Sequence, residues 1–368
     1  MMSFSMILPE LEEYLTLMGG EEYIGHIIGL FTITAGLSRF WSGRFAERVG
    51  RVKVMLFGSI ICAICGALYS FTFTIQMFLI LRLIHGLSTG WRPIGATAYL
   101  ADIAPSGKIG EAMGYLGIAG STGMALGPAL GSIIKEEMSF DAMFYASSIM
   151  GLVSVLLTIK LPETLANPRP PQWTDLNIFK GKTLNFGVWP PSLVTLFETF
   201  AFGVVITLYP ILVNHLGFKY KGLFMLVVVV ASISMRFVAG KASDRRGRLP
   251  VLMWGLGLLA IAMFVIGFAE TQWQAIFGAT LYGLAIGINR PTVFAWTADK
   301  APEGQIAISL ATMLLALEIG IGSGAFISGA IYDNNISNIP TAFALGGILS
   351  TISLVFVVWR LQVNKKRK

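Results

Sequence analysis

The chain is poor in the residues on which metal and redox chemistry depends. Its 368 residues include only two cysteines and three histidines, and charged residues make up 13% of it. The histidines, His26, His85 and His215, are scattered, and no HExxH-like pair occurs. Cys62 and Cys65 have no second pair, so we interpret them as small packing residues of one helix. We therefore expect no metal, no cofactor and no catalytic residue.

The sequence also lacks the polar majority of a soluble protein. Hydrophobic residues make up 55%, and the mean hydropathy is +0.71. Lipid cannot satisfy backbone polar groups, and continuous rather than alternating hydrophobicity favours helices over a barrel. The sequence thus predicts an all-α polytopic membrane protein. After a shorter first run, apolar runs long enough to cross a bilayer lie near residues 22–42, 53–73, 77–100, 110–133, 140–160, 188–212, 222–240, 249–268, 272–297, 304–331 and 340–360.

Basic residues gather on one side if the chain crosses the membrane at each run. The opposite loops hold only Lys135, Lys219 and Lys221. By the positive-inside rule, the crowded side, with the central linker and the C-terminus, is cytoplasmic. We expect a cell membrane, the inner membrane of a bacterium, and we interpret the net charge of +7 as a topology signal rather than a sign of nucleic-acid binding. The crowded side holds Arg44, Arg48, Arg51, Lys53, Lys108, Lys160, Arg169, Lys180, Lys182, Lys241, Arg245, Arg246, Arg248, Lys300 and the terminal "KKRK".

The chain contains an internal repeat. "RFWSGRFAERVGR" at 39–51 matches "RFVAGKASDRRGR" at 236–248, a shift of 197 residues (236 − 39), and Pro105 and Pro302 share that shift. Repeated halves are typical of transporters that work by alternating access. We predict two homologous bundles of six helices each, with boundaries at 1–161 for the N-terminal bundle, 162–187 for a cytoplasmic linker, and 188–368 for the C-terminal bundle with its basic tail.

The first helix looks shortened at its N-terminus. The opening segment offers about 15 residues, roughly 22 Å of helix, which is short for a crossing. Pro9 and Glu10 follow a very short apolar run, which argues against a signal peptide. We expect a half-length first helix.

Several motifs resemble those of one transporter family. "GRFAERVGR" resembles the loop 2–3 signature of the major facilitator superfamily, with departures at Phe45, Glu47 and Val52. "RLIHG" is similar to a fourth-helix signature of proton-coupled members, with His85 where Gln is usual, and "LPET" after the sixth helix is common in the drug:proton exporter branch. The resemblance implies the major facilitator fold, with two pseudo-symmetric six-helix bundles.

The fifth helix carries the sharpest resemblance. "GYLGIAGSTGMALGPALGS" is similar to the antiporter signature of the twelve-helix drug:proton exporters, except that Ser132 replaces the final glycine. The resemblance implies a bend that seals the interface of helices five and eight in exporters. Ordinary glycine-mediated packing is the alternative. The matching residues are Gly114, Gly123, Gly127, Pro128 and Gly131.

We interpret the repeated charge cluster as a cytoplasmic gate. Glycines at 43 and 50 would allow a tight loop and close helix approach. Glu47 and Asp244 are expected to face helix N-termini in the opposite half. Arg48 and Arg245 are expected to pair with the aspartates at 102 and 299, although charges that merely fix topology are the alternative. The proposed gate comprises Gly43, Glu47, Arg48, Gly50, Arg51, Asp102, Gly240, Asp244, Arg245, Gly247, Arg248 and Asp299.

Ionisable residues at membrane depth are candidates for binding or proton coupling. Arg92-Pro93 and Arg290-Pro291 look repeat-related, which suggests a positive pair for an anionic or zwitterionic substrate; structural pairing with carboxylates is the alternative. Glu198 is the predicted proton carrier, with Arg82 as its modulator, against the alternative of a structural acid. The candidates are Arg82, His85, Arg92, Glu198, Arg290 and Glu318.

These observations favour a monomeric, non-enzymatic, multi-pass secondary transporter. The leading hypothesis is proton-coupled export (antiport, efflux) of a small organic solute or drug. One alternative is a proton-coupled uptake symporter of a small anionic or zwitterionic metabolite. A remote alternative is a non-transporting membrane sensor or enzyme. The expected partners are the small-molecule substrate, protons and the lipid bilayer.

Overall fold

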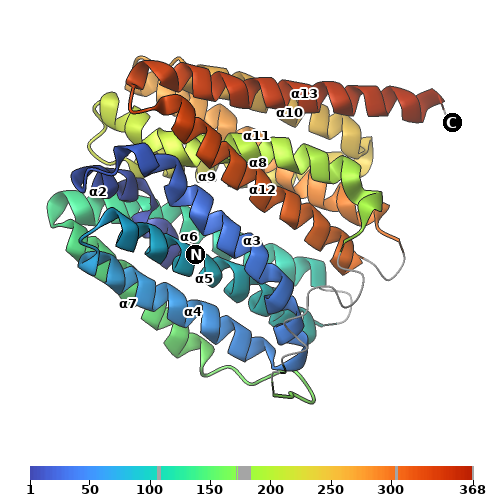
Figure 1. The fold of residues 1–368 in the computed structure, drawn as a ribbon. Helices are drawn as coiled ribbons and strands as arrows, with labels where there is room; N and C mark the ends of the chain where they lie inside the picture. The colour runs from blue at the N-terminus through green and yellow to red at the C-terminus, as the bar shows by residue number, and fades with distance from the viewer. Residues whose placement is uncertain (106–108, 171, 173–183, 303–305, 367–368) are drawn as a thin grey trace. The chain divides into compact units, whose positions relative to one another are not determined.

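The computed structural model describes residues 1–105, 109–170, 172, 184–302 and 306–366. In these ranges it contains α-helices and short 3₁₀ turns, and no strand (Figure 1). The helices are α1 (Met2–Ile7), α2 (Leu11–Leu17), α3 (Ile24–Arg48), α4 (Arg51–Leu68), α5 (Ile75–Ile103), α6 (Ile109–Glu137), α7 (Phe140–Thr158), α8 (Trp189–His215), α9 (Gly222–Arg246), α10 (Arg248–Gly267), α11 (Gln272–Lys300), α12 (Ile306–Tyr332) and α13 (Ile339–Lys366).

The 197-residue repeat extends to the helix boundaries. Helices α5 and α11 begin at 75 and 272 and end at 103 and 300, and α6 and α12 begin at 109 and 306. The same local chemistry starts corresponding helices. Thr74 caps α5 by accepting a hydrogen bond from the Met77 amide, and Thr271, 197 residues later, caps α11 in the same way.

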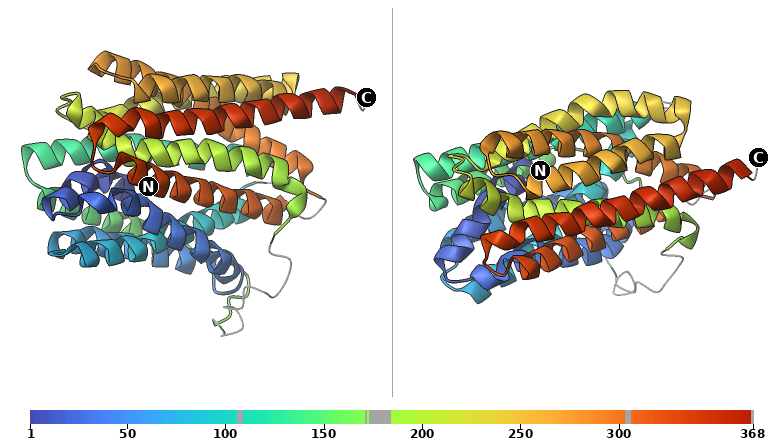
Figure 2. Two further views of the ribbon diagram at one scale, coloured as in Figure 1. Left: turned by 45° about the horizontal axis from the view of Figure 1, so that its top comes forward. Right: turned by 90° about the horizontal axis from the view of Figure 1, so that it is seen from above.

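The helices form two compact units, residues 1–20 with 30–183, and residues 21–29 with 184–368. In the first unit, α1 packs on α6 and α7, and α4 packs on α5 and α7. In the second unit, α8 packs on α12 and α13, and α10 packs on α11 and α13, so corresponding helices make corresponding contacts. Figure 2 shows α13 running alongside α8. Much of the predicted linker, 162–187, lies outside the described residues.

Helix α3 is shared between the two units. Its first residues, 24–29, group with the second unit, where Gly25 and Gly29 lie against Ala325 and Phe326 of α12. The rest of α3 groups with the first unit, where the Thr34 hydroxyl donates to the Leu83 carbonyl of α5 at 2.6 Å. Small residues at such contacts let helix backbones approach closely.

Seven helices of the described chain are long and apolar enough to cross a membrane, or eight if the bent α9 counts as one span. Helices α3, α5 and α11 are not among them, and all three carry arginines. The predicted short first helix proves to be a broken one. The 3₁₀ turn η1 (Leu8–Glu10) separates α1 from α2, and Pro9 at its start lacks an amide for helical hydrogen bonding.

Candidate functional site

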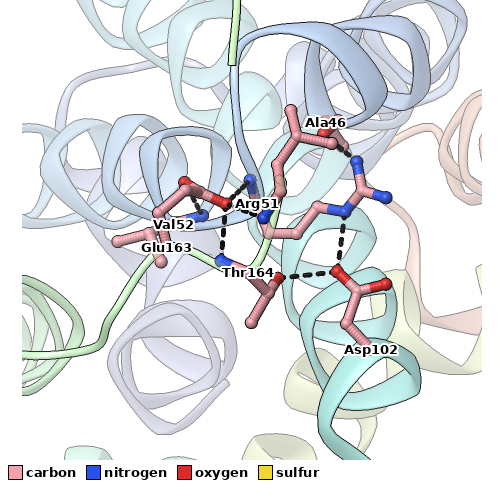
Figure 3. Close-up of polar contacts among 7 residues, drawn as sticks. Ala46, Arg51, Val52, Asp102, Glu163 and Thr164 are labelled. Carbon is pink, nitrogen blue, oxygen red and sulfur yellow. Dashed lines mark hydrogen bonds and ion pairs between the residues drawn. The ribbon is translucent and has the colours of Figure 1, made fainter. Parts of the chain in front are cut away.

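The first copy of the charged signature is mostly helical. Helix α3 continues through Arg48, and α4 begins at Arg51, so the connection is only two residues long. Gly50 within it has a φ of +133°, a conformation that side-chain-bearing residues rarely adopt. Glu163 of the "LPET" segment then caps α4, because its carboxylate accepts the amides of Arg51 at 2.8 Å and Val52 at 3.2 Å (Figure 3).

Arg51 connects this turn to the end of α5. Its Nε donates to Asp102 Oδ2 at 3.1 Å, and one terminal nitrogen donates to the Ala46 carbonyl (Figure 3). The Thr164 hydroxyl donates to the same Asp102 oxygen at 2.6 Å. The turn, the end of α5 and the "LPET" segment therefore form one polar cluster within the first unit.

The second unit repeats the ion pair without the "LPET" part. Arg248 Nε donates to Asp299 Oδ2 at 2.8 Å, and its terminal nitrogen contacts Asp244 and the Ser243 hydroxyl. Gly247, in the equivalent turn, has a φ of +87°. In each unit the arginine and the aspartate of the ion pair are 51 residues apart in the sequence, as the repeat requires (102 − 51 and 299 − 248).

Two details of the predicted gate differ in the structure. The sequence predicted Arg48 and Arg245 as partners of the two aspartates, whereas the observed partners are Arg51 and Arg248, three residues later. The reason is that the turn is so short that the first residue of the next helix already lies beside the aspartate. The close helix approach expected at Gly43 is also wrong, because a Cβ there would meet nothing within 4 Å.

The glycines of the antiporter-like signature lie on α6, a helix of the first unit. A Cβ on Gly123, Gly127 or Gly131 would press on the backbone of α1, between Met2 and Met6. Gly117 and Gly120 of the same helix have open space at this position. Gly114 also falls within α6, but the side chains of this part of the helix are outside what the structure describes. Glycine spacing on α6 thus provides close packing against α1, and Pro128 lies within that contact segment.

Arg82 and His85 meet in a buried polar group of the first unit. Arg82 is fully buried, donates to the Tyr69 hydroxyl at 3.2 Å, and lies 4.6 Å above the Phe31 ring. His85 is also fully buried, with Nδ1 3.3 Å from the same hydroxyl and Nε2 3.5 Å from Cys62 Sγ. Tyr69 therefore links the two residues that sequence spacing placed on one face of the helix.

Arg92 and Arg290 are not equivalent, contrary to the prediction. Because α5 and α11 coincide at a shift of 197, the counterpart of Arg92 is Asn289, and Arg290 points about 100° further round its helix. The packing agrees, since Gly58 of α4 lies against Arg92 and Gly255 of α10, its counterpart, lies against Asn289. The Arg-Pro dipeptide occurs one position later in the second half than the 197-residue shift requires, and this offset misled the sequence comparison.

The two arginines accordingly have different partners. Arg92 Nε donates to the hydroxyls of Ser59 at 3.1 Å and Ser154 at 3.2 Å, both within its own unit. Arg290 Nε instead lies 4.0 Å from Glu198 Oε1, and its guanidinium lies 5.1 Å from the centre of the Phe202 ring. Of these two arginines, only Arg290 has a carboxylate partner among the described residues.

The Glu198–Arg290 pair is the most unusual ionic arrangement in the second unit. The Glu198 side chain on α8 is 4% exposed, and that of Arg290 on α11 is 33% exposed. Glu198 Oε1 and Arg290 Nε are buried, and neither has a hydrogen-bond partner among the described residues. Tyr282, eight residues before Arg290 on α11, lies within electrostatic range of both charges, and its buried hydroxyl also lacks a described partner. Glu318 is buried on α12, which packs on α8.

One acidic group of the first unit has the geometry of a cation site. Carboxylate oxygens of Glu10, Glu13 and Glu136 lie within 4.8 Å of one another. The Lys135 ammonium already lies among them, 2.7 Å from Glu13 and Glu136 and 4.0 Å from Glu10. Lysine thus supplies the positive charge that a metal ion would otherwise bring. Ser132, the departure from the antiporter pattern, donates to Glu10 at 2.5 Å.

Sequence reasoning missed three residues of these sites. Glu163 was visible in the "LPET" motif, but its contact with a turn 112 residues away had no sequence signal. Tyr69 and Tyr282 resemble ordinary core aromatics in the sequence. For Tyr282 a signal was available, because it is the 197-residue counterpart of the candidate residue His85 (85 + 197).

The comparisons with known proteins agree with this architecture. A profile of the Major Facilitator Superfamily matches residues 1–235 and 191–368. Multidrug resistance protein 1 of Bacillus subtilis is 23% identical over 354 residues, which cover 93% of this chain and 88% of the relative. Quinolone resistance protein NorA of Staphylococcus aureus is 21% identical over 368 residues, 97% and 92% of the two chains. The solved structure of the human organic anion transporter MFSD10 (TETRAN) shares the fold, with a TM-score of 0.74 at 18% identity over 97% and 95% of the two chains.

Proposed function

Because the chain belongs to the major facilitator superfamily, and is therefore a multi-pass membrane transporter of small molecules rather than an enzyme, we propose that it is a proton-coupled exporter of a small organic solute. The proposed carrier of the proton is Glu198. We further propose that the two six-helix bundles alternate access across a cell membrane, with the linker and C-terminus in the cytoplasm.

The observation that carries this proposal is the pair formed by the buried Glu198 and the partly exposed Arg290 at 4.0 Å. A carboxylate and a guanidinium at membrane depth stabilise each other, and removing the charge of one leaves the other without compensation. Protonation of Glu198 therefore releases Arg290. A site that changes its net charge when a proton binds can link proton binding to a change of conformation or of ligand affinity.

Export is supported by two further observations. The glycine-rich α6 resembles the antiporter signature, and the relatives from Bacillus subtilis and Staphylococcus aureus have names that refer to drug resistance. An exporter of this kind would exchange a cytoplasmic solute for an external proton. At 21–23% identity these relatives support a mode of transport and leave the substrate open.

The same pair favours uptake by symport as a second candidate function. Once Glu198 is neutral, the Arg290 guanidinium is available for a carboxylate or phosphate of a substrate. Proton and anion would then bind together and travel in one direction. The arrangement of Arg290 beside Glu198 is what favours this alternative over a sensor or an enzyme.

Inverted membrane vesicles distinguish the two directions. Their lumen corresponds to the external side, so acidifying it drives protons outward through the transporter. An exporter should then accumulate a fluorescent quinolone in the lumen, and a protonophore should abolish the accumulation. A symporter should instead empty vesicles preloaded with an anionic or zwitterionic metabolite. Absence of any gradient-dependent movement across a broad solute panel would contradict proton coupling.

We also propose that the duplicated charge clusters form the cytoplasmic gate. Each cluster ties the end of one helix to the turn between two others within its unit, through Arg51 and Asp102 or Arg248 and Asp299. Both turns contain a glycine with a positive φ angle, Gly50 in the first and Gly247 in the second. A rigid turn at this end of each unit is suited to carry contacts that form in one state and break in another.

A further inference from the structure

One arginine of the second unit has aromatic neighbours where a carboxylate would be expected. The Arg360 guanidinium, near the end of α13, lies 5.1 Å from the centre of the Trp189 ring, 5.9 Å from Phe356 and 5.8 Å from Trp359. The rings contact one another, with centroids 5.5 Å apart for Trp189 and Phe356. No ion pair is found for Arg360 among the described residues, and its buried Nε has no hydrogen-bond partner there. We call these four residues the aromatic arginine site.

The site lies where the exposed apolar face of α13 ends. Exposed apolar residues follow one another along α13 at spacings of four, three and four, which place them on one face of the helix. Trp359 ends that row and is 51% exposed, while Trp189 at the start of α8 is 48% exposed. Half-exposed tryptophans are typical of the boundary between acyl chains and headgroups. The row is Ile348, Ile352, Val355 and Trp359.

The charge of this region is one-sided. After Asp333 the sequence contains no acidic residue, whereas Arg360 is followed by the terminal "KKRK". Five basic residues in the last nine (360–368) attract an anion at the membrane surface. Stacking on rings holds a guanidinium by its face and leaves its N–H edge for a planar or tetrahedral anion.

We propose that the aromatic arginine site binds the phosphate of an anionic phospholipid. The apolar row on α13 contacts the acyl chains, the tryptophans lie at the headgroup level, and Arg360 donates to the phosphate oxygens. A lipid matches both the apolar row and the basic end, whereas a soluble phosphate matches only the second. This inference is independent of the proposed direction of transport and of Glu198.

Native mass spectrometry of the full-length purified protein tests the site. We expect phosphatidylglycerol to bind more tightly than phosphatidylcholine with the same acyl chains. Arg360→Gln should weaken phosphatidylglycerol binding about tenfold, the effect of losing a charge-assisted hydrogen bond. Arg246→Gln, which removes an exposed cation from the end of α9 in the same unit, is the matched control and should leave binding unchanged. Equal binding by the parent and Arg360→Gln would overturn the proposal.

Two further measurements cover the remaining outcomes. Inorganic phosphate should not displace the lipid; displacement would show a site for a soluble anion and overturn the lipid assignment. If Arg360→Gln fails to fold, quenching by phosphatidylglycerol with brominated chains is measured in the otherwise unchanged protein. The quenching should fall when Trp189 and Trp359 are both replaced by phenylalanine. Undiminished quenching in that variant would place the lipid elsewhere.

Discussion

At the scale of single residues, we expect alanine substitutions at the two glycines of the first charged signature to change the free energy of unfolding in opposite directions. Gly50 has a φ of +133°, and a Cβ there would strike the Glu163 carboxylate that caps α4. We expect Gly50→Ala to lower the free energy of unfolding by about 1–3 kcal/mol. Gly43 lies inside α3 with open space around it, so Gly43→Ala should raise that free energy by about 0.5–1 kcal/mol. Denaturant unfolding in detergent measures both, and equal effects would contradict this account of the turn.

The paired arginines and aspartates offer a second comparison between the units. Arg51 and Asp102 side chains are 14% and 32% exposed, whereas Arg248 and Asp299 are 22% and 51% exposed. Water screens the second pair more, so we expect coupling energies of about 1 kcal/mol for the first pair and less for the second. Double-mutant cycles with Arg→Gln and Asp→Asn changes measure the two couplings. A larger coupling in the second unit would show that exposure does not control them.

At the scale of helices, α6 contains both close-packed and open glycines. A Cβ on Gly131 would collide with the Met6 backbone of α1, whereas one on Gly120 would meet nothing within 4 Å. Gly131→Ala must push the helices apart, and we expect a loss of at least about 2 kcal/mol in unfolding free energy, while Gly120→Ala should be neutral or slightly stabilising. Thermal unfolding compares the two variants. If both are neutral, α1 and α6 are not held by this contact.

The placement of most helices followed from hydrophobic runs and the repeat, because the 197-residue spacing governs both the charged motif and the helix boundaries. The predicted first helix is instead divided into α1 and α2. Partners within those helices were harder to predict. Arg92 and Arg290 share an Arg-Pro sequence, yet a one-residue offset turns their side chains in different directions. Such an offset is small in the sequence but amounts to about 100° on a helix.

Contacts between distant segments had the weakest sequence signals. Glu163 caps α4 from the "LPET" segment, and Tyr69, just after α4, contacts both Arg82 and His85 of α5. Nothing in the local pattern of either residue specifies its partner, since each contact depends on how helices pack. Glu198 and Arg290 could each be selected in advance because ionisable residues within apolar runs are rare, although their pairing could not be predicted.

At the scale of the whole molecule, the proposed gate predicts a shift between conformations. Asp244 contacts Arg248 in the second cluster, and Asp244→Ala removes one carboxylate of the signature. We expect this change to favour the cytoplasm-open state by about 1–3 kcal/mol. Spin-label distances between the cytoplasmic ends of the two bundles measure the populations. Identical distance distributions in the variant and the parent would reduce the cluster to a topology signal.

The central claim is that the proton is carried by Glu198, and replacing this carboxylate tests it most directly. In inverted vesicles with an acidic lumen, Glu198→Gln should lose gradient-driven quinolone accumulation but keep exchange of labelled for unlabelled quinolone at equal pH. Glu270→Gln, which removes an exposed carboxylate between α10 and α11 of the same unit, is the control and should keep both activities. If Glu198→Gln still accumulates quinolone as the parent does, Glu198 does not carry the proton and the account is wrong.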